Sequence, residues 1–205
     1  MKRNLVIVLA AVVLAVAVWW LRRGPQTTSE APAPVAGQYL NDSLGVGMLL
    51  PSTPGWSFRY APDVPGGGLA MAIHAGQTAS VRLYEHARTD VSGLEEVIRD
   101  RRKQLAEVFQ VTDVDSVIES VIKDEFVDFD GHPAWQWQAV TEPVAVAGKA
   151  PQRVMFMLLI LERPEHVFEA VGILGYPARP TPEQQAALQA LANDITFILG
   201  SFQVR

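Results

Sequence analysis

The residues able to carry out chemistry are few in this sequence, and their spacing matches no catalytic motif. The chain has no cysteine, which excludes disulfides, thiolate metal sites and cysteine nucleophiles. None of the four histidines (His74, His86, His132 and His166) has a histidine partner three or four positions away, as a helical zinc site requires. His132 precedes Pro133 directly after a predicted turn, which is typical of a solvated hairpin residue. We therefore expect no metal ligand among them.

An acidic cluster at the same turn is a second candidate for metal binding. Asp124, Glu125, Asp128 and Asp130 offer oxygen ligands of the kind that Ca²⁺ prefers. The segment matches only part of an EF-hand loop and lacks its distal glutamate, so a solvated hairpin tip is expected instead. A glycosidase-like pair of carboxylates is assembled only in space, and the sequence leaves that alternative open.

Nucleophilic and phosphate-binding motifs are missing from the sequence. No G-x-S-x-G elbow occurs, and Ser92 has the position of a helix cap. The glycine run 66–68 lacks the Lys-Ser/Thr of a phosphate-binding loop and does not open a helix, so a tight or flexible loop is expected there. We predict a protein that is not an enzyme, with no catalytic, metal-binding or cofactor-binding residues and no cofactor.

Charge is distributed unevenly along the chain. The formal net charge is −5, but residues 1–24 carry four basic residues and no acid, while 21 of the 22 acidic residues lie within 38–205. An acidic domain argues against nucleic-acid binding, because phosphate contacts require clustered Lys and Arg. The densest positive charge in the domain is Arg99, Arg102 and Lys103, together with Arg101. A solvated helix face is one interpretation, and a docking patch for an acidic partner or lipid headgroups is the other.

Apolar residues at helical spacing predict two amphipathic helices, over 92–109 and 181–199. Each helix begins with a capping box, formed by Ser92 with Glu95 and by Thr181 with Gln184. Pro182 takes the first position of the second helix and Gly200 follows its end. The predicted buried stripes are Leu94, Val97, Ile98, Leu105, Val108 and Phe109 in the first helix, and Leu188, Leu191, Ala192, Ile195 and Ile198 in the second.

Alternating and continuous apolar runs predict about seven strands. Residues 117–140 have the pattern of a hairpin with Asp130-Gly131 at its turn, and Trp135 and Trp137 on one face. Residues 153–161 are apolar on both faces, which favours a central strand covered from both sides. Further strands are predicted at 48–50, 69–74, 79–85 and 167–174. The predicted fold class is α+β: an α/β/α sandwich with a mostly antiparallel sheet and two main helices.

The N-terminal segment has the pattern of a membrane anchor. Residues 5–21 form an unbroken apolar run, which is long enough to span a bilayer as a helix, and a Pro/Ala-rich linker at 24–37 follows the anchor (1–23). A cleaved signal peptide ending near Ala15-Val16-Ala17 and a buried soluble helix are the alternatives. The residues expected to hold the segment in the bilayer are Leu5, Leu9, Leu14, Trp19, Trp20, Leu21, Arg22 and Arg23.

The orientation of the anchor determines where the domain (38–205) would lie. Positive residues flank the apolar run on both sides, and the α-amine adds to Lys2 and Arg3 on the N-terminal side. The positive-inside rule therefore gives a slight preference for a cytoplasmic N-terminus. We expect a single-pass protein of the inner (cytoplasmic) membrane with its domain on the periplasmic or extracellular side.

Three short motifs resemble the PsbP-like or DcrB-like fold group, which also contains a Ran-binding nuclear transport factor. They are the run 45–51 with Trp56, the turn 130–134 with its Gly-x-Pro-Ala pattern, and the C-terminal run 198–202. The resemblance spans about 38–205 and implies a non-enzymatic accessory or binding domain attached to a larger assembly. The matched positions are structural, so no functional residue is carried over from the group.

The functional expectation combines the anchor, the missing catalytic motifs and this resemblance. We expect an accessory or assembly subunit whose extracytoplasmic domain docks on a respiratory, photosynthetic or secretory membrane complex, with protein partners and the bilayer as its contacts. An envelope domain that holds a lipid or other apolar molecule, for example in a cavity lined by Trp135 and Trp137, is the alternative. An enzyme whose site is assembled in space is the third hypothesis.

Overall fold

The computed structural model describes residues 37–204, apart from residue 77 and residues 145–149. The predicted anchor, with Leu5, Leu9, Leu14, Trp19, Trp20, Leu21, Arg22 and Arg23, lies outside the described residues, as does the linker up to residue 36. Among the helices that are described, none combines the length and apolar character needed to cross a membrane.

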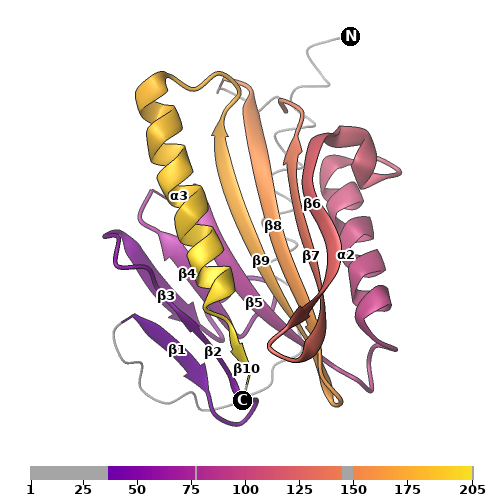
Figure 1. The fold of residues 1–205 in the computed structure, drawn as a ribbon. Coiled ribbons are helices and arrows are strands. Elements are labelled where there is room, and N and C mark those ends of the chain that lie inside the picture. Colours follow the sequence, from indigo (N-terminus) through magenta and orange to yellow (C-terminus); the bar gives the residue numbers. More distant parts are fainter. Residues whose placement is uncertain (1–36, 77, 145–149, 205) are drawn as a thin grey trace.

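A seven-stranded antiparallel sheet forms the centre of the domain (Figure 1). Its strand order is β3-β4-β5-β9-β8-β7-β6, so the chain builds one half of the sheet, crosses to the far edge at β6 and returns toward the middle. The strands are β3 (Trp56–Tyr60), β4 (Ala70–His74), β5 (Ala79–Ala87), β6 (Ile118–Phe129), β7 (His132–Thr141), β8 (Gln152–Glu162) and β9 (His166–Pro177).

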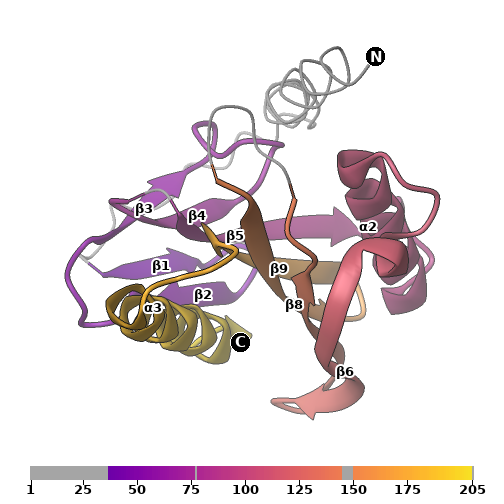
Figure 2. The same cartoon turned by 90° about the horizontal axis from the view of Figure 1, so that it is seen from above.

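Two helices cover opposite faces of this sheet (Figure 2). Helix α2 (Leu94–Phe109) continues into a short 3₁₀ helix, η1 (Val114–Val117), and helix α3 (Pro182–Gly200) follows β9. Alternate residues of β8 show the two-sided burial: Phe156 and Leu158 belong to the core under α2, and Met157 and Leu159 to the core under α3. The predicted central strand and the predicted two-helix α+β fold are thereby confirmed.

A second, three-stranded sheet packs against the core on the α3 side. It consists of β1 (Gln38–Asn41), β2 (Val46–Leu49) and β10 (Gln203–Val204), in the order β1-β2-β10. Only β2 was predicted. Trp56 begins strand β3, and its indole Nε1 donates to Asp194 Oδ2 at 2.9 Å. The missed strands β1, β3 and β10 are two to five residues long, and their pairing depends on neighbours elsewhere in the fold.

The β6–β7 hairpin forms as predicted. Asp130 and Gly131 both have positive φ, 55° and 81°, which is the backbone of a two-residue hairpin turn. Phe129 and His132 are paired across it. Trp135 and Trp137 lie on one face of β7, as predicted, and are buried against α2.

The two predicted capping boxes have different outcomes. At α3, Thr181 and Gln184 form the reciprocal box with Pro182 in the first turn, and Gly200 is the last helical residue rather than the next one. At α2 the predicted box was wrong, because Gly93 is the N-cap and offers no side chain. The backbone N–H of Ser92 instead donates to Glu96 Oε2 at 2.6 Å. Glu96, rather than Glu95, has the reach to satisfy that group.

Candidate functional site

Strand β6 is the last strand at one edge of the large sheet. It pairs with β7 on one side, and no described strand pairs with its other side (Figure 1). Residues 119–126 are all exposed. Three of them are large and apolar, with exposed fractions of 52% for Val121, 56% for Ile122 and 66% for Phe126. Exposed apolar side chains on an edge strand are a recognised site for pairing with another chain.

The backbone of β6 is irregular at one end and regular at the other. Its register with β7 shifts between Ile118 and Ser120 and again between Val121 and Lys123. From Lys123 to Phe129 the pairing with β7 is continuous. Bulges bend an edge and hinder further pairing, so the regular half is the stretch on which an added strand would fit.

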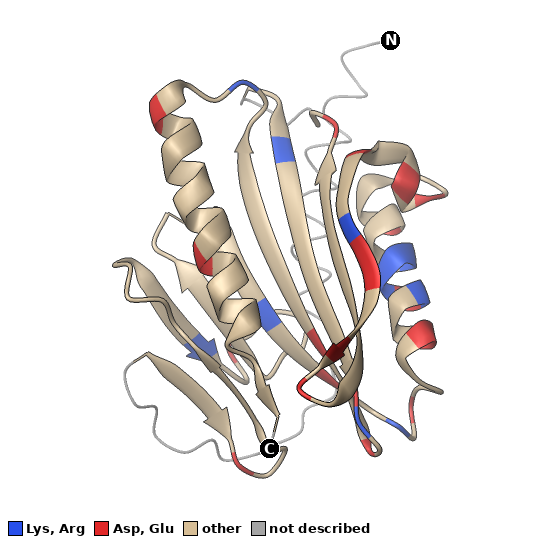
Figure 3. Cartoon of the chain, viewed as in Figure 1, with Lys and Arg blue, Asp and Glu red and all other residues tan. Residues whose placement is uncertain are grey.

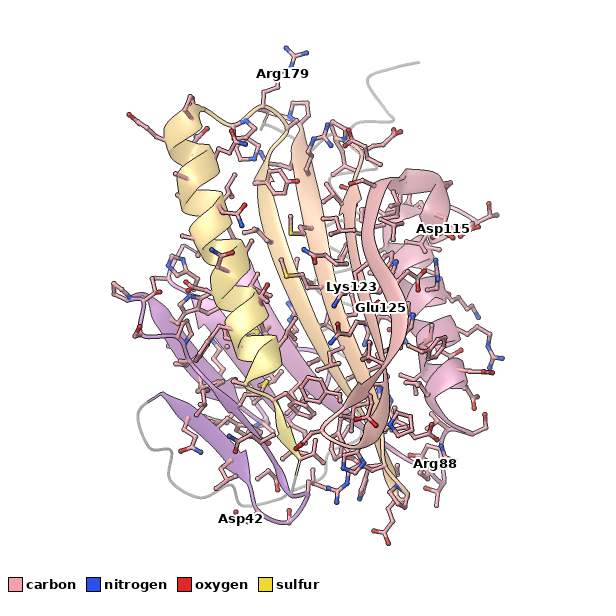
Figure 4. The ribbon with its side chains drawn as sticks, in the orientation of Figure 1. Asp42, Arg88, Asp115, Lys123, Glu125 and Arg179 are labelled. Carbon is pink, nitrogen blue, oxygen red and sulfur yellow. The ribbon has the colours of Figure 1, made fainter. Side chains whose placement is uncertain are left out.

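The charges on β6 are mainly acidic (Figure 3). The four acids of the predicted cluster, Asp124, Glu125, Asp128 and Asp130, all lie on this strand or at its turn. Lys123 lies beside Glu125, with Nζ 3.0 Å from Oε1 (Figure 4). Asp128 Oδ1 accepts the backbone N–H of Gly131 at 2.7 Å, so the carboxylate also supports the turn. Asp128 and Asp130 therefore belong to the hairpin tip, whereas Asp124 and Glu125 lie further back along the strand.

Helix α2 carries the basic residues that we considered for docking. Arg102 is engaged within the domain: Nη2 lies 2.7 Å from Asp115 Oδ1, and Nη1 lies 3.6 Å from Asp124 Oδ2. Arg99 is 72% exposed and has only loose ion contacts, and Lys103 is exposed. The structure thus places Arg99 and Lys103 on the surface, whereas Arg102 is paired with acidic side chains of the same domain. A docking role for these three residues stays a prediction.

Arg101, which the charge pattern grouped with that basic run, lies inside the domain. It is 5% exposed and pairs with Glu169 of β9, which is 1% exposed. Its Nε donates to Oε1 and its Nη2 to Oε2, the latter at 2.6 Å. The second partner of the carboxylate is His86, with Nε2 3.2 Å from Oε2. Arg101 lies four residues after Val97 and four before Leu105, a spacing that places it on the apolar stripe.

This buried group is held in its charged form. Burial by itself would raise the pKa of Glu169, but the Arg101 charge and the hydrogen bonds from His86 and Arg101 outweigh burial and lower it. Tyr84, beside this pair, has its pKa raised by burial. The group is packed and internally satisfied, which suits a structural clamp between α2 and the sheet better than a reactive centre.

A polar cleft of about 450 Å³ lies between the β1–β2 turn and the β8–β9 turn, lined by residues 42–45 and 163–166. Arg163 Nη1 donates to the carbonyl of Leu44 across it at 3.3 Å. His166 Nδ1 lies 2.7 Å from Glu85 Oε1. The lining contains both acidic residues, Asp42 and Glu165, and the basic Arg163, so charge favours no single kind of ligand. Within the described part of the chain, no three His, Asp or Glu residues are arranged to hold a metal ion.

The tryptophans proposed as a ligand cavity are part of the packed core. The rings of Trp135 and Trp137 stack with centroids 6.1 Å apart, and Trp137 is 6.2 Å from Phe156. Trp135 Nε1 donates to Asp124 Oδ1 at 2.8 Å. Both rings fill space between the sheet and α2 as core residues.

The comparisons with known proteins show similarity of structure but not of sequence. No family model and no curated protein matches the sequence. Solved structures with a similar arrangement include the Ran-binding protein Mog1p of Saccharomyces cerevisiae, at 12% identity, a TM-score of 0.49, and coverage of 84% of this chain and 96% of Mog1p. LpqN of Mycobacterium tuberculosis, described as involved in cell envelope biogenesis, has 11% identity, a TM-score of 0.40 and coverage of 73% and 80%.

A Bacteroides thetaiotaomicron protein is also similar, at 12% identity and a TM-score of 0.44. The match covers 82% of this chain and only 48% of that protein, so this chain spans about half its length. The domain is thus similar in its arrangement of elements to Mog1p and LpqN. Similarity at this level concerns the order of helices and strands and carries no function.

Proposed function

We propose that this chain is a membrane-tethered, non-catalytic interaction subunit whose extracytoplasmic domain docks on a protein of a larger membrane complex. The observation that carries the proposal is the exposure of Val121, Ile122 and Phe126 on the edge strand β6. Each of these side chains loses hydrophobic stabilisation by facing water, on the order of 1 kcal/mol or more for a side chain of this size. A docked partner would recover that free energy.

The remaining features are consistent with a domain that presents a surface rather than a reaction centre. Two oppositely charged groups inside the core, Arg101 and Glu169, satisfy each other. The acidic surface of the domain opposes adsorption to anionic lipid, and the predicted linker would separate it from the bilayer. Docking is therefore expected on a protein rather than on lipid headgroups.

Co-purification tests the proposal. The full-length chain would be isolated from its native membranes in mild detergent beside Phe126→Gln, and bound proteins identified by mass spectrometry. Phe197→Gln is the matched control, because Phe197 is also exposed, at 48%, but lies on α3. We expect a stoichiometric partner with the wild type and the control, and its loss with Phe126→Gln. A chain that migrates alone under every mild condition would contradict the proposal.

A further inference from the structure

We propose that β6 binds its partner by strand addition, and that the added strand is an extended, basic segment of another protein, lying along Lys123–Phe129. The inference rests on the proposed docking function and specifies its geometry and chemistry. Strand addition supplies main-chain hydrogen bonds along an edge and leaves specificity to alternate side chains. The described residues of β6 supply both an unpaired main-chain edge and a pattern of alternate side chains.

The regular half of β6 has the geometry that strand addition needs. From Lys123 to Phe129 the strand is paired continuously with β7, so alternate backbone N–H and C=O groups point away from the sheet. No described strand occupies that side. Residues 123–126 and 128 are exposed, and Phe126 is the most exposed large apolar side chain described.

The register of the hairpin assigns each side chain to a face. Asp124, Phe126 and Asp128 lie opposite Trp137, Trp135 and Pro133, so these three share the face that α2 covers further along the sheet. Phe126 therefore lies between two carboxylates on one face, of which Asp124 also accepts the Trp135 indole N–H and lies 3.6 Å from Arg102. A complementary strand has an apolar residue opposite Phe126 and a lysine or arginine two positions to either side.

A second copy of this chain fits the same edge poorly. In an antiparallel arrangement centred on Phe126, the two phenylalanines face each other, but Asp124 of each copy lies opposite Asp128 of the other. Like charges directly opposite in a sheet are destabilising. Two copies could avoid placing these aspartates opposite each other only by pairing in a shifted register. The bulges near Ser120 and Lys123 limit such shifted registers. Charge therefore favours a basic segment over self-pairing.

A designed peptide tests this chemistry. The probe is a fluorescent nine-residue peptide with a central valine and lysines two positions to either side, and its counterpart carries glutamates instead. With full-length protein in detergent, we expect the lysine peptide to bind and the glutamate peptide not to bind. Asp128→Asn keeps the acceptor for the turn but removes the charge, and should weaken binding about two- to five-fold. Phe126→Gln should weaken it as well, and Phe197→Gln should leave it unchanged.

Peptide methylation and amide exchange test the strand geometry. Only alternate N–H groups of an added strand face β6, so N-methylation of one alternate set should abolish binding and of the other set should spare it. Hydrogen exchange should show new protection within Lys123–Phe129. Strand addition would be overturned if both sets of N-methylated peptides bound equally well, or if the new protection lay outside Lys123–Phe129. The proposed docking function would then still be tested separately by co-purification. A concentration-dependent dimer that excludes the peptide would assign the edge to a second copy and overturn the basic segment.

Discussion

Arg101 and Glu169 form an ion pair inside the core that joins α2 to β9. Both groups are nearly inaccessible to water, and the second carboxylate oxygen is also within reach of His86. A buried pair of this kind adds little stability when it is complete, because desolvation offsets the attraction between the charges. Its larger effect appears when one partner is substituted, because the other partner is then left as an uncompensated buried charge.

Neutralising one partner is therefore expected to be costly. Glu169→Gln leaves the Arg101 guanidinium buried beside a neutral amide, and the free energy of unfolding should fall by about 3–5 kcal/mol. Glu162→Gln is the control, because the Arg88–Glu162 pair is about one-third exposed and should contribute about 1 kcal/mol or less. Urea unfolding followed by circular dichroism measures both. Equal losses in the two variants would show that the pair is not a buried charge clamp.

The same pair predicts a specific dependence of stability on pH. The pKa of Glu169 is lower in the folded protein than in the unfolded chain, so its ionised form stabilises the fold at any pH above the ordinary glutamate pKa of about 4.3. That contribution is lost as the pH falls through the folded-state pKa. Urea midpoints between pH 7 and pH 3 should therefore drop for the wild type with a component that Glu169→Gln lacks. Parallel profiles would contradict this assignment.

Only some properties of the candidate-site residues were predictable from the sequence. Arg99, Arg102 and Lys103 stood out by their density of charge, but density does not show that Asp115 and Asp124 already engage Arg102. Arg101 could have been separated from them by its spacing from Val97 and Leu105. The exposure of Phe126 was not predictable, because it depends on β6 being an edge, and strand order is not encoded in local periodicity.

At the scale of elements, helix α3 approaches β9 at a glycine. A Cβ on Gly172 would lie 2.5 Å from Ile195 Cγ2 and 3.1 Å from the Met157 carbonyl oxygen, so the helix rests almost directly on the strand. Asp194, next to Ile195, accepts hydrogen bonds from Thr53 and from the Trp56 indole at 3.0 and 2.9 Å. The close approach at Gly172 and this polar contact together hold α3 over the sheet.

Filling that close approach should loosen α3. Gly172→Ala places a methyl group where Ile195 lies, and we expect a loss of about 1–3 kcal/mol in unfolding free energy. Gly175→Ala on the same strand meets only the Thr78 carbonyl oxygen at 3.9 Å and should cost nothing measurable. Thermal unfolding compares the two variants directly. Equal melting temperatures would mean that α3 shifts without cost.

Elements with a clear local sequence pattern were predictable. Strands that form only by pairing with distant parts of the chain were not. The two helices, the Asp130-Gly131 hairpin and the strand β8 follow from periodicity and turn chemistry. Strands β1, β3 and β10 are short, and their pairing depends on neighbours distant in the sequence. The cap at Ser92 was wrong because Gly93 allows the chain to enter the helix one residue later than the motif implies.

On the scale of the whole molecule, the sheet has one long edge that the described residues leave uncovered. Figure 2 shows β6 at the margin of the sheet, away from α3. A predicted tether at the N-terminus and an exposed apolar edge on the domain are both features of a protein that holds a partner near a membrane. The proposal joins the two, with the acidic charge of β6 selecting a basic partner.

Photo-crosslinking in native membranes tests this account most directly. Phe126 would be replaced by p-benzoylphenylalanine in the full-length chain, and Phe197 in a parallel control. The account predicts a discrete crosslinked adduct with one protein partner from position 126, and no such adduct from position 197. No adduct from position 126, or the same set of adducts from both positions, would contradict a docking role for the β6 edge.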